Sequence, residues 1–415
     1  MARKPLEGMR VVDLAWVWSG PYCCMLLAHL GADVIKVESS SRLCMTRSTP
    51  PWPDGKPLPP TSGGGIFASN NLEKRSVTFN LKTAGGLEAT RRLISTSDVV
   101  VNSYAVGVME RLGLSYDDLK KLKPDIILMS LSGYGETGPY RKYVAYGQAQ
   151  AALSGFTRLT GHRGWPPKNC GFVLADPNAG VHGAFAVLVA LRHRLKTGQG
   201  QCIDLSQWEA TLQLMGEGIM EYQLAGTEPG PNDGNRHPRM SPHGVFRCRD
   251  MEEDHRGVKL DMWVSIAVAT EDQWARLCTA MGKPELASDP RFATLALRKR
   301  NEDELEDIIT AWTRPQTPDE VTRRLQAAGV PAFTCNTYKD VFEDANLNQR
   351  SFFVDLNHPT FGVRTHPGVP WRMSHAPADI TRPSPLLGQH TEEVLKELGY
   401  SDDAIEDLRQ SGALT

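Results

Sequence analysis

The first 38 residues contain a strand–helix–strand unit, which constrains the fold more than any other segment of the chain. A β-branched run over Arg10–Leu14 predicts a strand, and Gly20-Pro21 predicts a break before a helical pattern over Tyr22–Leu30. Gly31 ends that pattern, and Ala32–Glu38 predicts a second strand. Two strands joined in this way are expected to run parallel with a right-handed crossover. The turn lacks the glycines of G-x-G-x-x-G, so the unit indicates a nucleotide-type fold without the standard dinucleotide fingerprint.

Strand and helix patterns go on alternating through the first half of the chain. The predicted strands are Ser76–Leu81, Asp98–Asn102, Asp125–Leu131 and Cys202–Leu205, and the predicted helices are Ala84–Ser95 and Gly183–Lys196. Ser39–Gly65 is rich in Pro, Ser and Gly and predicts a long surface loop. This alternation is typical of a doubly wound parallel sheet, so we predict the α/β class.

A second domain is expected, because 415 residues exceed the size at which one hydrophobic core keeps growing. Ala225–Pro242 is rich in Pro, Gly and Asn, which predicts an interdomain connection. The patterns that follow indicate a smaller α+β domain. They are strands at Gly244–Cys248 and Trp263–Ala267 and helices at Glu271–Met281, Glu302–Thr313 and Pro318–Ala328. From about Ser351 the chain returns to Pro- and His-rich loops, and it finishes with helix patterns at Thr391–Leu398 and Ser401–Ser411.

Charge and cysteine usage exclude several classes of partner. Lys and Arg total 46 against 48 Asp and Glu, a net charge of −2, so no basic excess points to nucleic acid or an anionic membrane. The N-terminus lacks the apolar core of a signal peptide, and no apolar run is long enough for a membrane span, which favours a cytoplasmic protein. The eight cysteines show no C-x-x-C or zinc spacing, so we expect reduced thiols and no metal site.

Asp176 is the strongest candidate for a catalytic side chain. It follows an apolar run that begins at Gly171, and Pro177, Asn178 and Gly180 come directly after it, before a long apolar helix. A strand-like run that leads into a helix places the carboxylate at a helix N-terminus, where backbone N–H groups stabilise negative charge. An ionised carboxylate held there can attack an acyl group. From this segment alone an N-cap role is the favoured interpretation, since Asp is among the best caps and caps far outnumber nucleophiles.

Short motifs occur in order along nearly the whole chain: LEGMRVVDL, GADVIKVE, EKRSVTFNLK, RLGLSYDDL, SLSGYGETGPY, ADPNAG, TGQGQCIDLSQWEA, AGVPA and LGQHTEEVLKELGYSDDAIEDL. Each is weak alone, but the ordered set resembles the class III CoA-transferase family, which includes formyl-CoA transferase, carnitine and bile-acid CoA transferases and α-methylacyl-CoA racemase. The resemblance implies a Rossmann-like large domain built from residues 1–224 and 350–415, with the linker and small domain over 225–349. It also implies a homodimer whose two chains interlock like linked rings.

The resemblance further implies an enzyme that moves CoA reversibly between an acyl-CoA and a free carboxylic acid. CoA thioesters are then substrates, and no cofactor is permanently bound. The family's nucleophile falls on Asp176, which would form a mixed anhydride with the acyl group and then an aspartyl-CoA thioester. The acceptor carboxylate would repeat these steps in reverse.

The family's CoA contacts fall on residues spread over the first part of the chain: Val17 through its backbone, Arg47, Lys82, Tyr104, Arg111 and Leu112. Cations such as Lys82 and Arg111 suit the phosphates of CoA. Taken without the family, Arg111 in E-R-L-G-L is also a favourable last-turn cation of a helix, and Lys82 reads as a solvated surface residue.

Several positions depart from the pattern of formyl-CoA transferase. Ser39, Ser103 and Val144 replace an arginine, an asparagine and a lysine at the CoA site, and Arg42, Arg141 or Lys142 are candidates for supplying the missing charge. Trp18, near Trp16, replaces a glutamine that binds the small substrate. Two large aromatics there favour a bulkier, partly apolar acyl group, unless they simply pack under the sheet. The glycine-rich lid is not recognisable, and Ser241-Pro242-His243-Gly244 is its nearest candidate, which makes Gly244 a candidate substrate contact.

Two alternatives follow from the same family. A racemase needs acid/base groups on both faces of the α-carbon, and family racemases carry a His-Asp dipeptide where this chain has Tyr146 and Gly147. His182 is better explained as a packed helix residue than as the missing base. Transfer is therefore favoured, with Tyr146 and Gly147 as further substrate-site candidates. The second alternative is one subunit of a hetero-oligomeric CoA transferase; because Asp176 is present, this chain would be the active subunit, paired with a homologous chain.

Overall fold

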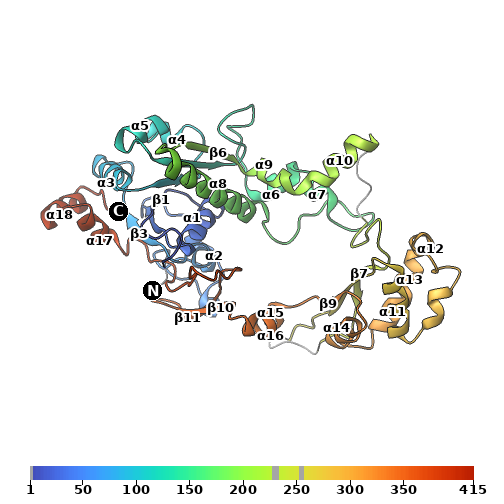
Figure 1. The fold of residues 1–415 in the computed structure, drawn as a ribbon. Helices are drawn as coiled ribbons and strands as arrows, with labels where there is room; N and C mark the ends of the chain where they lie inside the picture. The colour runs from blue at the N-terminus through green and yellow to red at the C-terminus, as the bar shows by residue number, and fades with distance from the viewer. Residues whose placement is uncertain (1–2, 227–232, 252–256) are drawn as a thin grey trace. The chain divides into compact units, whose positions relative to one another are not determined.

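The computed structural model describes residues 3–226, 233–251 and 257–415. Its residues fall into two compact units (Figure 1). Unit 1 lies within the bounds Met1–Thr157, Asn169–Thr227 and Asn348–Thr415, and unit 2 lies within Arg158–Lys168 and Glu228–Leu347. Unit 1 is therefore assembled from both halves of the chain. No sequence pattern singles out Arg158–Lys168, a short segment that groups with unit 2 through tertiary contacts.

Unit 1 contains a six-stranded sheet in which all paired strands run parallel. The strands are β1 (Arg10–Asp13), β2 (Asp33–Glu38), β3 (Arg75–Thr78), β4 (Val99–Asn102), β5 (Ile127–Ser132) and β6 (Cys202–Ser206). Their order is β3-β2-β1-β4-β5-β6, which confirms the predicted α/β class. The order reverses between β1 and β4, and ligands of open α/β sheets bind at such switch points, outside the carboxyl ends of the strands.

Helices cover both faces of this sheet, so its strands are apolar on both sides. On one face, Val11 of β1 belongs to a core with residues of α1 (Ser19–His29) and α8 (Ala175–Thr197). On the other face, Val12 belongs to a core with α3 (Ala84–Ser95), α5 (Tyr116–Leu122), α17 (Thr391–Glu397) and α18 (Asp402–Gln410). Figure 1 shows α17 and α18, from the end of the chain, beside β3 and α3 from its beginning.

The other elements of unit 1 are short and lie around the sheet. They are the helices α2 (Gly65–Asn70), α4 (Val108–Arg111), α6 (Gly147–Leu153), α9 (Gln207–Leu212) and α10 (Gly216–Ala225), the 3₁₀ turns η1 (Met45–Ser48), η2 (Pro53–Gly55) and η3 (Gln213–Met215), and the antiparallel hairpin of β10 (Phe353–His358) and β11 (Gly362–Pro367); α7 (Phe156–Leu159) lies across the boundary between the units.

Two helices of unit 1 begin earlier than their sequence patterns predict. α1 begins at Ser19 and α8 at Ala175, so Pro21 and Pro177 lie within their first turns. The predicted breaks before these helices are wrong for one physical reason: the N–H groups of a first helical turn have no intrahelical partner, so a proline there loses no hydrogen bond.

Unit 2 is a small α+β unit around an antiparallel sheet of β7 (His243–Arg247), β8 (Trp263–Ala267) and β9 (Ala332–Thr334). Its helical elements are α11 (Glu271–Met281), η4 (Pro284–Ser288), α12 (Leu295–Arg300), α13 (Glu302–Thr313), α14 (Pro318–Ala327) and α15 (Tyr338–Glu343), and α16 (Ala345–Gln349) leads back into unit 1. The core of unit 2 packs Trp274, Leu277 and Phe292 against Leu305 and Leu325. It is a separate core, as the length of the chain predicts.

The eight cysteines all carry free thiols. In the part of the chain that the structure describes, no helix is both long and apolar enough to cross a membrane.

Candidate active site

A cavity of about 540 Å³ opens at the carboxyl edge of the parallel sheet, and we call it the Asp176 cavity. Its walls come from the segments after β1, β2, β4, β5 and β6, together with the first turn of α8. The lining residues are Trp16, Val17, Ser19, Arg42, Ser103–Val106, Arg111, Leu131–Tyr134, Arg141–Tyr146, Asp176 and Gln207. The cavity thus lies where the strand order predicts a ligand site. It brings together five predicted site residues: Val17, Tyr104, Arg111, Tyr146 and Asp176.

Asp176 lies in the first turn of α8 and does not cap it. The N-cap is Leu174, and no side chain accepts a capping hydrogen bond there, so the alternative interpretation of Asp176 as an N-cap is wrong. Burial raises the pKa of the Asp176 carboxyl, and the side chain of Gln207 opposes part of that rise. A carboxylate with few hydrogen bonds and a raised pKa is a better nucleophile than a solvated one.

Gly147, the first residue of α6, allows the chain to pass directly beside Asp176. A Cβ added at Gly147 would overlap Asp176 Oδ2 and would lie 2.6 Å from Val173 Cγ1. Real Cβ atoms do not approach other atoms so closely, so only glycine fits here without displacing the carboxylate. The structure therefore gives Gly147 a steric role in holding Asp176 in place.

A second glycine, Gly180, allows α8 to pack closely against the start of α1, which follows the loop after β1. Gly180 packs against α1 so closely that an added Cβ would lie 2.8 Å from Ser19 O. Because Asp176 is one turn earlier on α8, this contact helps to set the position of its carboxylate at the cavity.

A fully buried charge cluster of Asp13, Lys36 and Lys74 supports the loop after β1. Asp13 Oδ1 accepts a hydrogen bond from Ala15 N at 2.9 Å, and Lys36 Nζ donates to Ala15 O at 2.7 Å. Lys74 Nζ donates to Asp13 Oδ2 and to Pro21 O, both at 2.8 Å. Burial acts to raise the pKa of Asp13, but the two lysines outweigh it and the pKa is lowered. The cluster remains charged and ties both ends of the loop that carries Trp16 and Val17 to the sheet.

Val17 has a left-handed backbone conformation with φ 65°. A β-branched residue is rare in this region, because its side chain crowds the backbone. Val17 N donates to Cys44 Sγ at 3.2 Å, and neighbouring Trp16 exchanges hydrogen bonds with Ser103 Oγ. The fold therefore holds Val17 in a strained conformation at the wall of the cavity, where the sequence predicts a backbone contact with CoA.

Four cations line the Asp176 cavity: Arg42, Arg111, Arg141 and Lys142. Within the described part of the chain, none of the four forms an ion pair with a carboxylate. Arg42 instead lies over the ring of Trp16, 4.5 Å from its centroid. Three of the four are the residues predicted to replace charge lost at Ser39, Ser103 and Val144. A cavity with free cations is suited to a ligand that carries phosphates.

Arg47, another predicted CoA contact, has different surroundings from the cations of the Asp176 cavity. It is fully buried, it donates from Nε and Nη2 to Glu38 at 2.8 and 2.6 Å, and it stacks over the ring of Phe67. Its Nη1 donates to Thr61 O. A guanidinium paired in this way is a structural link between β2 and the following loop, and it does not line the Asp176 cavity.

Three other predicted residues lie outside the lining of this cavity. Lys82 is exposed in the turn after β3, and Leu112 packs against the apolar core beneath α4. Trp18 makes an edge-to-face contact with Phe172 at 5.8 Å between ring centroids, while Trp16 does line the cavity. The aromatic wall is completed by Tyr134, Tyr143 and Tyr146.

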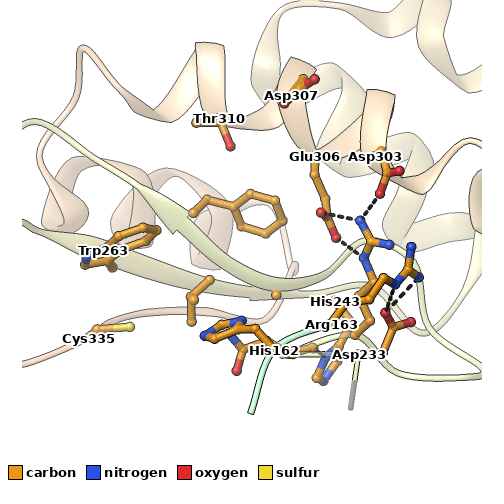
Figure 2. A pocket seen from close by; sticks show the side chains of 16 residues that line it. His162, Arg163, Asp233, His243, Trp263, Asp303, Glu306, Asp307, Thr310 and Cys335 are labelled. Carbon is orange, nitrogen blue, oxygen red and sulfur yellow. Dashed lines mark hydrogen bonds and ion pairs between the residues drawn. The ribbon is translucent and has the colours of Figure 1, made fainter. Parts of the chain in front are cut away.

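Gly244 belongs to unit 2, where it lies on β7 and lines a cavity of about 730 Å³ built from unit 2 alone (Figure 2). Ion pairs cross its rim: Arg163 Nη2 lies 2.8 Å from Asp233 Oδ1, and Arg236 pairs with both Asp303 and Glu306. These cations are neutralised by neighbouring carboxylates, in contrast to those of the Asp176 cavity.

Sequence reasoning missed two polar residues of the Asp176 cavity. Gln207 and Ser132 follow β6 and end β5, and both Gln207 Nε2 and Ser132 Oγ are buried without a hydrogen bond of ordinary length. Their place after strands, at the carboxyl edge of the sheet, is the signal that could have found them, since ligands of such sheets bind at that edge.

Comparison with known proteins gives one consistent result. A family model described as CoA-transferase family III matches residues 6–391. Succinyl-CoA–D-citramalate CoA-transferase of Chloroflexus aurantiacus is 33% identical over 407 residues, covering 98% of this chain and 97% of that protein. The β subunit of succinyl-CoA–L-malate CoA-transferase of the same organism is 35% identical over 409 residues, with 98% and 97% covered. The crystal structure of a CaiB/BaiF family protein from Brucella suis matches with a TM-score of 0.85 and 31% identity, covering 96% of this chain and 100% of that one.

Proposed function

Because the chain belongs to CoA-transferase family III, we propose that Asp176 carries out its reaction, the transfer of CoA from an acyl-CoA to a free carboxylic acid. One observation carries the proposal: among the described residues that line the Asp176 cavity, Asp176 is the sole carboxylate, and it lies there with four unpaired cations. The cations suit the phosphates of CoA, and the carboxylate is the nucleophile that acyl transfer requires.

The proposed reaction comprises four acyl substitutions, two that release the donor acid and two that take up the acceptor. An oxygen of Asp176 attacks the thioester carbonyl, the C–S bond breaks, and CoA thiolate leaves a mixed anhydride between the acyl group and Asp176. The thiolate then attacks the aspartyl carbonyl, which releases the first carboxylate and forms an aspartyl-CoA thioester. The acceptor carboxylate reverses both steps, so no water or net proton is consumed. The overall exchange converts one thioester and one carboxylate into another thioester and carboxylate of similar energy, so the transfer stays reversible.

The absence of a second base argues against racemisation by this site. Two-base chemistry needs acid/base groups on opposite faces of the α-carbon. Among the described residues of the cavity wall, none is a histidine, and Tyr146 occupies the position of the racemase histidine.

We propose that Val17, Tyr104 and Arg111 contact CoA, with Arg42, Arg141 and Lys142 as further phosphate partners. All six line the Asp176 cavity. Burial raises the pKa of Tyr104 to about 12, so its hydroxyl remains a donor at neutral pH. Lys82 and Leu112 lie outside the cavity wall. Their contact with CoA therefore stays a prediction from the family resemblance alone.

Replacing Arg111 by Ala is expected to weaken CoA binding about tenfold. A hydrogen bond to a charged group contributes roughly 1.5–3 kcal/mol, and the exposure of Arg111 places the loss near the lower end of that range. Isothermal titration with CoA measures the dissociation constant, and the exposed Arg350→Ala is the control, expected to match the unmodified protein. An unchanged affinity in Arg111→Ala would exclude Arg111 from the site.

Trapping the acyl-enzyme tests the proposed nucleophile. The protein is incubated with a panel of acyl-CoA donors that includes succinyl-CoA, the donor named for two relatives, and is then treated with hydroxylamine. Mass spectrometry of the peptide 171–180 is expected to show a hydroxamate on Asp176 that Asp176→Asn does not form. A donor that supports turnover without modifying this peptide would refute the mechanism. The donors that react also define the acyl group, which the aromatic wall predicts to be larger than formyl.

We infer that two copies of this chain associate through unit 1. Val181, Phe185 and Val189 of α8 form an apolar stripe at i, i+4 and i+8 and are 50%, 67% and 51% exposed. Monomeric proteins rarely leave such a continuous apolar stripe in water. Sedimentation of the purified chain is expected to give a dimer, and Phe185→Glu a single chain. If the unmodified chain sediments alone, the covering partner would be a homologous chain, as the β-subunit name of one relative suggests.

A further inference from the structure

Gln207 places a buried hydrogen-bond donor beside Asp176: its amide acts to lower the pKa of that carboxyl, yet Nε2 makes no hydrogen bond of ordinary length. The residue is 6% exposed and lines the cavity. A buried donor without a partner costs roughly 1–3 kcal/mol, so native structures rarely keep one without a use. An amide carries two N–H groups, so Gln207 can interact with Asp176 and still offer a donor to a ligand atom that accepts a hydrogen bond here.

The backbone fixes Gln207 relative to Asp176. Ser206 caps α9 by accepting from Glu209 N at 3.2 Å, and Gln207 is the first residue of that helix. Asn178 Nδ2, in the first turn of α8, donates to Ala210 O of α9 at 2.8 Å. This bond joins the two helix starts that carry Gln207 and Asp176. Both side chains are therefore held by rigid elements, which is what a preorganised catalytic site requires.

The chemical type of the side chain also matters. A cation in this place would form an ion pair with Asp176 and lower the nucleophilicity of its carboxylate. A neutral amide donates a hydrogen bond without such an ion pair and without giving up a proton. Gln207 lowers the pKa of Asp176 only in part, so the carboxyl retains a raised pKa. The arrangement leaves the nucleophile reactive and a donor available beside it.

We propose that Gln207 Nε2 donates a hydrogen bond to the carbonyl oxygen of the acyl group while Asp176 attacks it. The proposal rests on the proposed function of Asp176 and adds a catalytic residue to it. As the Asp176 oxygen bonds to the acyl carbon, the carbonyl oxygen becomes an oxyanion, and Gln207 stabilises it. When the C–S bond breaks, the carbonyl re-forms and the amide keeps its own protons throughout.

Gln207→Leu is expected to lower kcat by about 10²- to 10³-fold, the usual effect of removing one oxyanion donor. KM for the acyl-CoA should change only a few-fold, because the hydrogen bond strengthens in the transition state. Gln207→Met, which keeps the length of the side chain, should show the same loss and guards against a folding defect of the leucine variant. The matched control is Gln213→Leu, at an exposed glutamine in the adjoining turn, which should keep full activity.

The pH dependence separates this role from a merely electrostatic one. If Gln207 served only to keep Asp176 ionised, the variants would recover as the pH rises past the shifted pKa of Asp176. A transition-state donor predicts a loss that persists at high pH. Recovery of Gln207→Met to the kcat of the unmodified enzyme at high pH would overturn the proposal.

The trapping experiment separates failure of this inference from failure of the proposed function. We expect both Gln207 variants to form the Asp176 adduct, but 10²- to 10³-fold more slowly than the unmodified protein in a single turnover. Equal rates of adduct formation would refute the role of Gln207 and leave Asp176 as the nucleophile. No adduct in the unmodified protein would instead refute the proposed function.

Discussion

Asp176→Asn is expected to lower the turnover of CoA transfer by about 10³-fold or more, because it removes the nucleophile while keeping the shape of the side chain. The loss should appear in kcat, since the cations that line the cavity are unchanged and CoA should still bind. Initial rates with an acyl-CoA found by trapping, together with titration of CoA, measure the two effects. Asp117→Asn is a matched control: Asp117 also lies in the first turn of a helix, α5, but is exposed and paired with Lys120.

The same substitution should stabilise the fold at neutral pH. Burial raises the folded-state pKa of Asp176, so ionising it costs free energy in the folded protein that the unfolded chain does not pay. The cost is present at pH values above the folded-state pKa. It disappears as the pH falls through that pKa toward the unfolded value, because the carboxyl becomes neutral. Urea unfolding at neutral and acidic pH should therefore show an advantage of Asp176→Asn that shrinks in acid. A variant that is less stable than the parent at neutral pH would contradict this account.

Gly147→Ala is expected to lower kcat/KM by about 10²-fold, although Gly147 carries no reactive group. The added Cβ would overlap Asp176 Oδ2 and press on Val173, so the carboxylate must move. A displacement of about 1 Å at a reacting group can cost that much. The free energy of unfolding should change much less than the activity. The higher helix propensity of alanine in α6 offsets part of the cost of the poorer packing against Asp176 and Val173.

The control for Gly147→Ala is Gly216→Ala, at the first residue of α10. An added Cβ at Gly216 meets nothing within 4 Å, so the same chemical change should leave activity intact. If Gly147→Ala kept full activity, Val173 would have to yield instead of Asp176, and the close contact between Gly147 and the carboxylate would have no role in catalysis.

The sheet could be predicted because its strands carry their own signals. Val11, Val12 and Val99–Val101 form short apolar runs between breakers, and parallel strands buried on both faces need such runs. The starts of α1 and α8 could not be predicted, because Pro21 and Pro177 end a helix in one context and open one in another. The position of Asp176 at a helix N-terminus was predicted nonetheless, and α8 includes it in its first turn.

The candidate site was predicted unevenly for a related reason. Asp176 and Arg111 were predicted at the ends of helices from their neighbouring residues, and both line the cavity. The sequence around Arg47 does not distinguish it from a cation that binds a ligand. In the structure its guanidinium is paired with Glu38 and stacked on the ring of Phe67. The place of Gln207 after β6 marks it as a residue of the sheet edge, but only the structure shows that its Nε2 makes no ordinary hydrogen bond. Whether a polar group is satisfied depends on tertiary contacts, which sequence patterns do not report.

The buried trio of Asp13, Lys36 and Lys74 has an evolutionary consequence. Removing Asp13 would leave the ammonium groups of Lys36 and Lys74 buried without their shared carboxylate, which typically costs about 3–5 kcal/mol, a large part of a domain's stability. Relatives that abandon this arrangement must therefore have replaced its members together, or passed through a poorly folded ancestor. We expect the three positions to covary across homologues, and the loop with Val17 to diverge in step with them.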